Sequence, residues 1–247
     1  MIQGLIHQKI IFQPAKLESS FCFSFEYPYE EYFIPTRDGE WIHALFFQPK
    51  ADHKGTIIYF HGNSGNLQKW GIIAEDFIRL GFSVLMMDYR GFGKSTGVPS
   101  ENTMYEDAEV LIQWAYENLS VFNPVFYGRS LGTAVASYLA SIYHPGTLIL
   151  ETPFDQLYNV IWPIARPILK IMPIQYKFPT IEFLSSYQGK TIVFHGTKDL
   201  IIPLKSALNL KTALNPTDEF FIIEGGNHWN LRKFDIYHAK LKSVLIP

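Results

Sequence analysis

The sequence has few of the features that stabilise or anchor secreted proteins. It contains one cysteine in 247 residues, so no internal disulfide can form, and this usage fits a reducing compartment. That residue, Cys22, lies between two phenylalanines, and we expect it to be a small buried core residue, with a reactive thiol as the alternative. No basic run occurs and the net charge is −2, which argues against a nucleic-acid partner.

Targeting and membrane-spanning signals are also lacking. The first ten residues have neither the basic start nor the unbroken apolar stretch of a signal peptide, so we expect a cytoplasmic protein without an N-terminal membrane anchor. The most apolar stretch, residues 160–174, is interrupted by Arg166, Lys170 and several prolines. It is not expected to cross a bilayer.

What the sequence does contain is a large apolar fraction, 47% of its residues, enough for one α/β domain over residues 1–247. Residues 29–34 and 41–47 flank an Asp-Gly turn and predict an antiparallel hairpin. From residue 55 strands alternate with helices, which predicts a mostly parallel sheet with helices on both faces. The expected strands are 56–60, 82–87, 125–127, 147–150, 191–194 and 219–223, and the expected helices include 67–78, one capped by Ser100, and one at the C-terminus.

The most informative motif is Gly-Arg-Ser-Leu-Gly at residues 128–132, between a short apolar strand and a run of small helix-forming residues. A strand, a sharp turn and a helix in this order form a nucleophile elbow, which holds its serine in a strained backbone conformation. We expect Ser130 to be the nucleophile, raised into solvent at the head of the helix.

A serine nucleophile needs a base and an acid, which in this kind of site follow in the order Ser, Asp or Glu, His. Asp199 follows the strand at 191–194 and is the expected acid, with Asp155, one strand earlier, as its rival. His228 lies in a glycine turn after the strand at 219–223 and is the expected base, on an exposed turn. Ser130, Asp199 and His228 together predict acyl transfer.

The developing oxyanion needs hydrogen-bond donors that are already in place. The residue after the nucleophile supplies one, so we expect the backbone N–H of Leu131 to contribute. The second is expected from the loop after the strand at 56–60, at Asn63 or its neighbour Ser64.

Three motifs together resemble the alpha/beta-hydrolase-fold serine hydrolases, from about residue 28 onward: residues 61–66, 88–95 and 127–132. They are similar to a subfamily that is often membrane-anchored and includes protein depalmitoylases and lipid hydrolases. The resemblance implies that the triad falls on Ser130, Asp199 and His228. An N-terminal anchor and a cysteine-rich lipidation segment are missing from the pattern, so membrane attachment and protein deacylation do not transfer with it.

Other motifs indicate no cofactor. Residues 93–95 lack the spacing of a phosphate loop, and no histidine pair has metal-ligand spacing, so neither a nucleotide nor a metal is expected. His61 and His195 each precede a glycine at a strand end, where we expect the rings to bond the turn backbone. Arg129, inside the elbow, is expected either to contact an acidic group near the site or to form a salt bridge to a neighbouring loop.

A long insertion at about 156–189 is expected to form a small apolar cap over the serine. It favours a small-molecule or lipid-like ester with an apolar acyl group, and its basic residues would also allow peripheral contact with an anionic membrane. The alternative is that its side chains simply bury against the core. The sequence therefore predicts a serine esterase or thioesterase, with a peptidase or amidase, or a non-catalytic binding protein of this fold, as alternatives; it does not indicate an oligomeric state.

Overall fold

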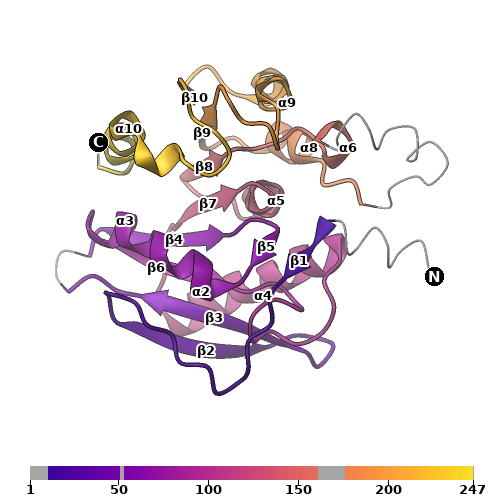
Figure 1. Ribbon diagram of the computed structural model, residues 1–247, viewed down its shortest axis with the longest axis vertical. Coiled ribbons are helices and arrows are strands. Elements are labelled where there is room, and N and C mark those ends of the chain that lie inside the picture. The colour runs from indigo at the N-terminus through magenta and orange to yellow at the C-terminus, as the bar shows by residue number, and fades with distance from the viewer. Residues whose placement is uncertain (1–10, 51–52, 161–175, 247) are drawn as a thin grey trace. The chain divides into compact units, whose positions relative to one another are not determined.

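The computed structural model describes residues 11–50, 53–160 and 176–246. These residues divide into two compact units. The N-terminal unit runs to Phe126 and includes Tyr176, and the C-terminal unit comprises residues 127–160 and 177–246. Figure 1 labels the elements of both units.

The N-terminal unit contains four adjacent strands in the order β4-β6-β3-β2. β4 (Gly55–Phe60) and β6 (Phe82–Met87) are parallel, whereas β3 (Trp41–Phe47) pairs antiparallel with both β6 and β2 (Tyr29–Pro35). The predicted hairpin is thus confirmed. β6 is buried along its whole length, as expected of an apolar strand with neighbours on both sides.

The helices of this unit follow the predicted positions with one difference. α4 (Glu101–Asn118) begins at Ser100, whose side chain forms a capping box with Thr103. The single helix expected at 67–78 is wrong, because the segment forms α2 (Leu67–Trp70), a 3₁₀ turn (Gly71–Ile73) and α3 (Ala74–Ile78). At the turn the ring of Phe25 packs on Gly71 so closely that a Cβ there would lie only 2.5 Å from it. Packing of the N-terminal segment thus accompanies the break in the helix.

Two further features of the N-terminal segment differ from expectation. β1 (Gln13–Pro14) pairs in parallel with β5 (Ser64–Gly65), a short ladder that the sequence pattern does not indicate. Cys22 is exposed, so its predicted burial is wrong. The neighbouring Phe23 is the buried residue, and its ring stacks on that of His43 at 5.5 Å, which directs the adjacent cysteine towards solvent.

The C-terminal unit carries its strands in the order β10-β9-β8-β7. β8 (Thr147–Glu151), β9 (Lys190–Gly196) and β10 (Glu219–Ile223) are parallel, and β7 (Val125–Arg129) starts at the last residues of the N-terminal unit. Its helical elements are α5 (Gly132–Tyr143), α6 (Leu157–Val160), α8 (Thr180–Ser185), α9 (Leu204–Asn209), α10 (Asp235–Leu245) and the 3₁₀ turns Leu210–Ala213 and Leu231–Lys233.

These helices pack on the strands through apolar side chains. α5 contacts β8 and α8, and α9 contacts β9. α10 packs on β9 through Tyr237, whose ring lies 5.1 Å from that of Phe194. The loops that carry the predicted triad residues Ser130, Asp199 and His228 follow the carboxyl ends of β7, β9 and β10.

The predicted cap at 156–189 lies partly outside the described residues, because 161–175 are not among them. α6 and α8 lie on either side of that gap, and the N–H of Leu157 donates to the carbonyl of Lys177 at 3.0 Å. Phe178 is fully buried. Among the helices in the described ranges, none combines the length and apolar character needed to span a membrane.

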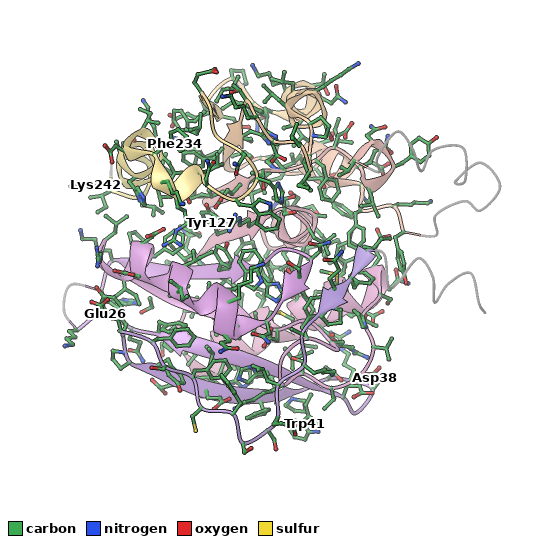
Figure 2. The ribbon with its side chains drawn as sticks, in the orientation of Figure 1. Glu26, Asp38, Trp41, Tyr127, Phe234 and Lys242 are labelled. Carbon is green, nitrogen blue, oxygen red and sulfur yellow. The ribbon has the colours of Figure 1, made fainter. Side chains whose placement is uncertain are left out.

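A buried ion pair anchors the turn after β6. Arg90 donates from Nε and Nη2 to Asp107 of α4, both at 2.7 Å, and from Nη1 to Asp38 in the hairpin turn at 2.6 Å (Figure 2 labels Asp38). Burial raises the pKa of the Asp107 carboxyl against the opposing effect of Arg90. Hydrogen bonds from Arg90 hold the pKa of Asp38, at the exposed end of the cluster, well below its usual range.

This cluster generates a stability prediction. Asp107→Asn removes the buried negative charge that pairs with Arg90. The positive charge of the guanidinium is then paired only with Asp38, which is exposed. We expect the free energy of unfolding, measured by urea titration, to fall by about 3 kcal/mol. Asp38→Asn is the matched control and should cost distinctly less, because solvent screens its side of the pair. Equal losses in the two variants would contradict this account.

Candidate active site

Ser130 lies in the turn between β7 and α5 with a φ of +51°, in the left-handed region that non-glycine residues rarely adopt. The turn is tight because a Cβ on Gly128 would lie 2.4 Å from the carbonyl oxygen of Gly132. The N–H of Ser130 donates to the carbonyl of Glu151 at the end of β8, at 2.9 Å. Ser130 is only 9% exposed, so the expectation that it stands free in solvent is wrong.

The loops that carry Asp199 and His228 are in direct contact. β9 and β10 are paired in parallel with Gly196 opposite Ile223, so both loops start at the same level of the sheet. The N–H of Lys198 donates to the carbonyl of Gly226 at 2.8 Å. A Cβ on Gly196 would lie 2.2 Å from that same oxygen, so glycine is required for this approach.

The three predicted residues form one hydrogen-bonded chain. His228 Nδ1 lies 2.8 Å from Asp199 Oδ2, and His228 Nε2 lies 3.1 Å from Ser130 Oγ. The other oxygen of Asp199 accepts the N–H groups of Ile201 at 2.9 Å and Ile202 at 2.8 Å. With Nδ1–H donating to the carboxylate, Nε2 is left to accept the serine proton, which is the arrangement required for general-base catalysis.

His228 is 3% exposed, so the prediction of an exposed histidine is wrong. Its imidazole is held between Asp199 and Ser130, and the ring of Trp229 packs edge-on against it at 4.8 Å. The glycines at 225–226 show in the sequence where the loop turns. Whether His228 is buried depends on side-chain packing, which the sequence pattern does not indicate.

Asp155, the rival acid, has other partners. Its carboxylate accepts hydrogen bonds from Ser206 at 2.5 Å and from Asn159 and Asn209 at 2.7 Å each. Burial raises the pKa of Asp155, but these hydrogen bonds outweigh it and leave the pKa below its usual value. The contacts described for Asp155 tie α6 to α9, whereas Asp199 is the carboxylate hydrogen-bonded to His228.

The two histidines at strand ends bond backbone carbonyls, which confirms the expectation for them. His61 Nδ1 lies 2.6 Å from the carbonyl of Gly62, and His195 Nε2 lies 2.9 Å from that of Ile202. His195 also lies behind the acid, with Nε2 3.7 Å from Asp199 Oδ2. Burial lowers the pKa of His195 despite the attraction of that carboxylate, so its ring is neutral at pH 7.

Arg129 contacts a buried carboxylate beside the triad, the first of its two predicted roles. Its Nε lies 3.2 Å from Oε1 of Glu151, a residue with no exposed surface. Its Nη2 donates to the backbone carbonyl of His228 at 2.9 Å, and its guanidinium lies 6.0 Å from the ring centre of Trp229. The sequence motif predicts an acidic partner but not the bond to the histidine's backbone.

The two predicted oxyanion donors belong to different units. Leu131 is the N-terminal cap of α5, and Asn63 lies in the N-terminal unit, where its side chain donates to the carbonyl of Ile11 at 3.0 Å. Their joint action on an oxyanion therefore stays a prediction.

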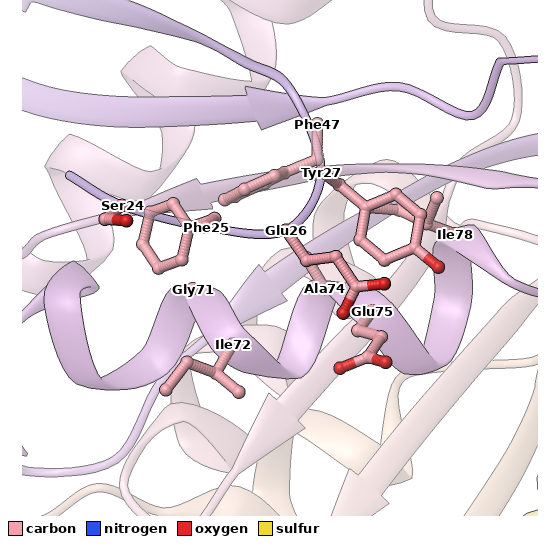
Figure 3. A pocket seen from close by; sticks show the side chains of 10 residues that line it. All are labelled: Ser24, Phe25, Glu26, Tyr27, Phe47, Gly71, Ile72, Ala74, Glu75 and Ile78. Atoms are coloured by element: carbon pink, nitrogen blue, oxygen red, sulfur yellow. The ribbon is translucent and has the colours of Figure 1, made fainter.

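Figure 3 shows a cavity of about 190 Å³ in the N-terminal unit, between residues 24–27 and the helical segment 71–78. Two carboxylates, Glu26 and Glu75, line it, and Glu75 already pairs with Arg79. None of the predicted triad residues is among its lining residues. We therefore assign this cavity no part in the triad's chemistry.

The state of His195 generates a pH prediction. Its folded pKa lies below the unfolded value of about 6.5, so the unfolded chain binds the additional proton between the two values. The contribution of His195 to the free energy of unfolding should therefore be fully present above pH 6.5. It should be lost progressively as the pH drops below that value. His195→Gln keeps a donor for Ile202 and should flatten this fall in urea titrations from about pH 7 to 5. His53→Gln, at an exposed site, should leave the slope unchanged, and an unchanged slope in His195→Gln would refute the assignment.

Comparison with known proteins identifies the family of this chain. Residues 51–187 match the model of the Hydrolase_4 family, described as serine aminopeptidase, S33. The chain is 27% identical over 217 residues to human alpha/beta hydrolase domain-containing protein 17B, covering 85% of this chain and 73% of that protein. It is 29% identical over 204 residues to an uncharacterized protein of Mycobacterium tuberculosis, covering 79% and 70%.

Solved structures show the same fold. An esterase of Pyrococcus furiosus superposes with a TM-score of 0.72 at 16% identity, covering 95% of this chain and 96% of that one. A Xanthomonas campestris a/b serine hydrolase without lid gives 0.65 at 17% identity, covering 88% and 91%. The predicted fold class, a mostly parallel sheet with antiparallel strands and helices on both faces, is thus confirmed. With the family model matching more than half of its residues, the chain belongs to the Hydrolase_4 family and is a hydrolase of the alpha/beta-hydrolase fold.

Proposed function

We propose that the protein is a serine hydrolase that cleaves carboxylic esters or thioesters through an acyl-enzyme. The observation that carries this proposal is the hydrogen-bonded chain from Asp199 through His228 to Ser130, with the serine in an elbow. A neutral serine hydroxyl is a poor nucleophile near pH 7, so His228 Nε2 takes its proton as Oγ attacks the substrate carbonyl. Asp199 orients the ring and stabilises the imidazolium.

The same imidazolium then returns the proton to the leaving alcohol or thiol, and water attacks the acyl-serine in a second cycle of base and acid catalysis. In our proposal the N–H groups of Leu131 and Asn63 bind the oxyanion of each tetrahedral intermediate. Leu131 is suited to this because it stands at the N-terminus of α5, where backbone N–H groups and the helix dipole favour negative charge.

We propose a substrate with an apolar acyl group. The residues that directly follow the acid and the base are exposed and apolar: Leu200 is 86% exposed and Trp229 is 54% exposed. Ile201 and Tyr158 are also exposed. Exposed apolar side chains bind hydrocarbon more readily than polar groups, and Trp229 packs against the ring of His228. The insertion at 156–189 would complete the acyl site as a cap.

We also propose a cytoplasmic location, with peripheral membrane contact through the insertion at 156–189. The exposed free thiol of Cys22 supports a reducing compartment. The basic residues Arg166 and Lys170 within an apolar segment support contact with an anionic surface.

The second candidate is an aminopeptidase, favoured by the match to a family described as serine aminopeptidase, S33. An aminopeptidase needs an unpaired carboxylate to bind the substrate's ammonium group. In the described part of the C-terminal unit, Glu151 is paired with Arg129, and Asp155 accepts hydrogen bonds from three side chains. Neither of these two carboxylates is therefore available to bind an ammonium group, and the two candidates are distinguished by the substrate test below.

Hydrolysis of para-nitrophenyl esters of increasing acyl length tests the proposal. We expect turnover, with kcat/KM rising with acyl length up to the capacity of the site, and we expect Ser130→Ala to lower kcat by about 10⁵-fold. Amino-acid para-nitroanilides serve as the peptidase probe. Faster cleavage of the anilides than of the esters would favour the aminopeptidase. Absence of turnover on both would favour a binding protein, and equal rates for Ser130→Ala would mean another nucleophile.

The identity of the acid is tested by a matched pair of substitutions. Asp199→Asn keeps the size of the side chain but favours the wrong imidazole tautomer, so kcat should fall by about 10³- to 10⁴-fold. Asp155→Asn disturbs the contacts with Ser206 and Asn209 but leaves His228 in place, and kcat should stay within a few fold. A larger loss in Asp155→Asn would transfer the role of acid to that residue.

A further inference from the structure

The side chain of Arg129 joins the nucleophile's strand to the loop of the proposed base. It belongs to β7, directly before Ser130, and its Nη2 donates to the backbone carbonyl of His228 at 2.9 Å. That carbonyl belongs to the loop after β10, which contains Gly225, at a φ of +75°, and Gly226. The N–H of Lys198 already holds the loop at the carbonyl of Gly226, at 2.8 Å. The bond from Arg129 adds a restraint two residues later, on the carbonyl of the histidine itself, and so restricts the position of the imidazole.

Glu151 holds the guanidinium in place. Its carboxylate is completely buried, with Oε1 3.2 Å from Arg129 Nε. Its other oxygen, Oε2, accepts the hydroxyl groups of Tyr127 at 2.7 Å and Tyr237 at 3.2 Å. Those two hydroxyls are themselves 2.7 Å apart. Hydrogen bonds fix the carboxylate through Oε2, and its Oε1 forms an ion pair with the guanidinium, so the orientation of the buried carboxylate also sets where the positive charge of Arg129 lies.

The same glutamate also positions the nucleophile. Its backbone carbonyl accepts the N–H of Ser130 at 2.9 Å, so its main chain holds the serine while its side chain, through Arg129, holds the histidine. Contacts with Glu151, at the end of β8, thus help to fix the positions of both reacting atoms, Ser130 Oγ and His228 Nε2. Displacements of about 1 Å between such groups can lower a rate by about 10²-fold.

We propose that Arg129 and Glu151 are positioning residues that fix the base relative to the nucleophile. This inference rests on the proposed function, since it assigns the pair a part in the chemistry of that site. The structure gives each residue a distinct share: Glu151 orients Arg129, and Arg129 holds the carbonyl of His228.

Arg129→Lys is the first test. A lysine can keep the charge opposite Glu151, but it is shorter and lacks the planar fork, so it cannot bind Glu151 and the His228 carbonyl together. On the best para-nitrophenyl ester we expect kcat to fall by about ten- to a hundredfold with KM within about twofold. Wild-type kcat in this variant would overturn the proposal.

A double variant separates positioning from stability. Arg129→Met with Glu151→Gln removes both buried charges, and the glutamine oxygen still accepts the hydroxyl of Tyr127, so the fold should be retained. We expect a melting temperature near that of the wild type together with a kcat at least tenfold lower. A folded double variant with wild-type kcat would mean that the pair serves stability alone. Arg90→Lys, in the other buried arginine cluster, is the matched control and should alter stability without altering kcat.

A readout without substrate keeps the positioning role testable if no ester is cleaved. The Nδ1 proton of His228, shared with Asp199 at 2.8 Å, should give a low-field resonance in the proton NMR spectrum, assigned by its loss in His228→Gln. In Arg129→Lys the resonance should broaden through faster exchange with water, while Arg90→Lys leaves it sharp. An unchanged resonance would refute positioning, whereas lack of turnover in the wild type with an intact resonance would refute only the proposed hydrolysis.

Discussion

The contact between Gly196 and Gly226 is the constraint on which the geometry of the site depends. A parallel pair of strands brings two loops to the same edge of a sheet, but it does not by itself bring their side chains within hydrogen-bond distance. Here a backbone carbonyl occupies the space of a missing Cβ, 2.2 Å from where that atom would be. The loops that carry Asp199 and His228 meet because Gly196 has no side chain to hold them apart.

Much of this arrangement can be predicted from the sequence, for identifiable reasons. Apolar runs and turn residues locate β6 and β10 at their observed bounds, because both are short apolar runs bounded by turn residues, which is the local signal of a strand. The order of Ser130, Asp199 and His228 follows from the positions of strand ends, and the structure brings all three together in one unit. Local patterns suffice where the fold delivers each residue at the end of a regular element.

The features that the sequence does not reveal all depend on contacts between distant segments. Periodicity continues through residues 67–78, but Phe25 packs against Gly71 where the helix breaks. The burial of His228 depends on Ser130, 98 residues earlier, and the exposure of Cys22 depends on which neighbour packs on His43. The bond from Arg129 to the His228 carbonyl gives no local signal, because any residue at 228 would offer the same oxygen.

Trp229 gives the protein a built-in optical reporter. Its indole is half exposed, packs edge-on against the imidazole of His228 and lies 6.0 Å from the guanidinium of Arg129. Indole emission responds to the polarity of its surroundings and to nearby charge. A hydrocarbon chain that displaces water from this ring, or an imidazole that gains a proton beside it, would alter its fluorescence. In a variant whose other four tryptophans are replaced, events at the site could thus be followed in real time without a chromogenic leaving group.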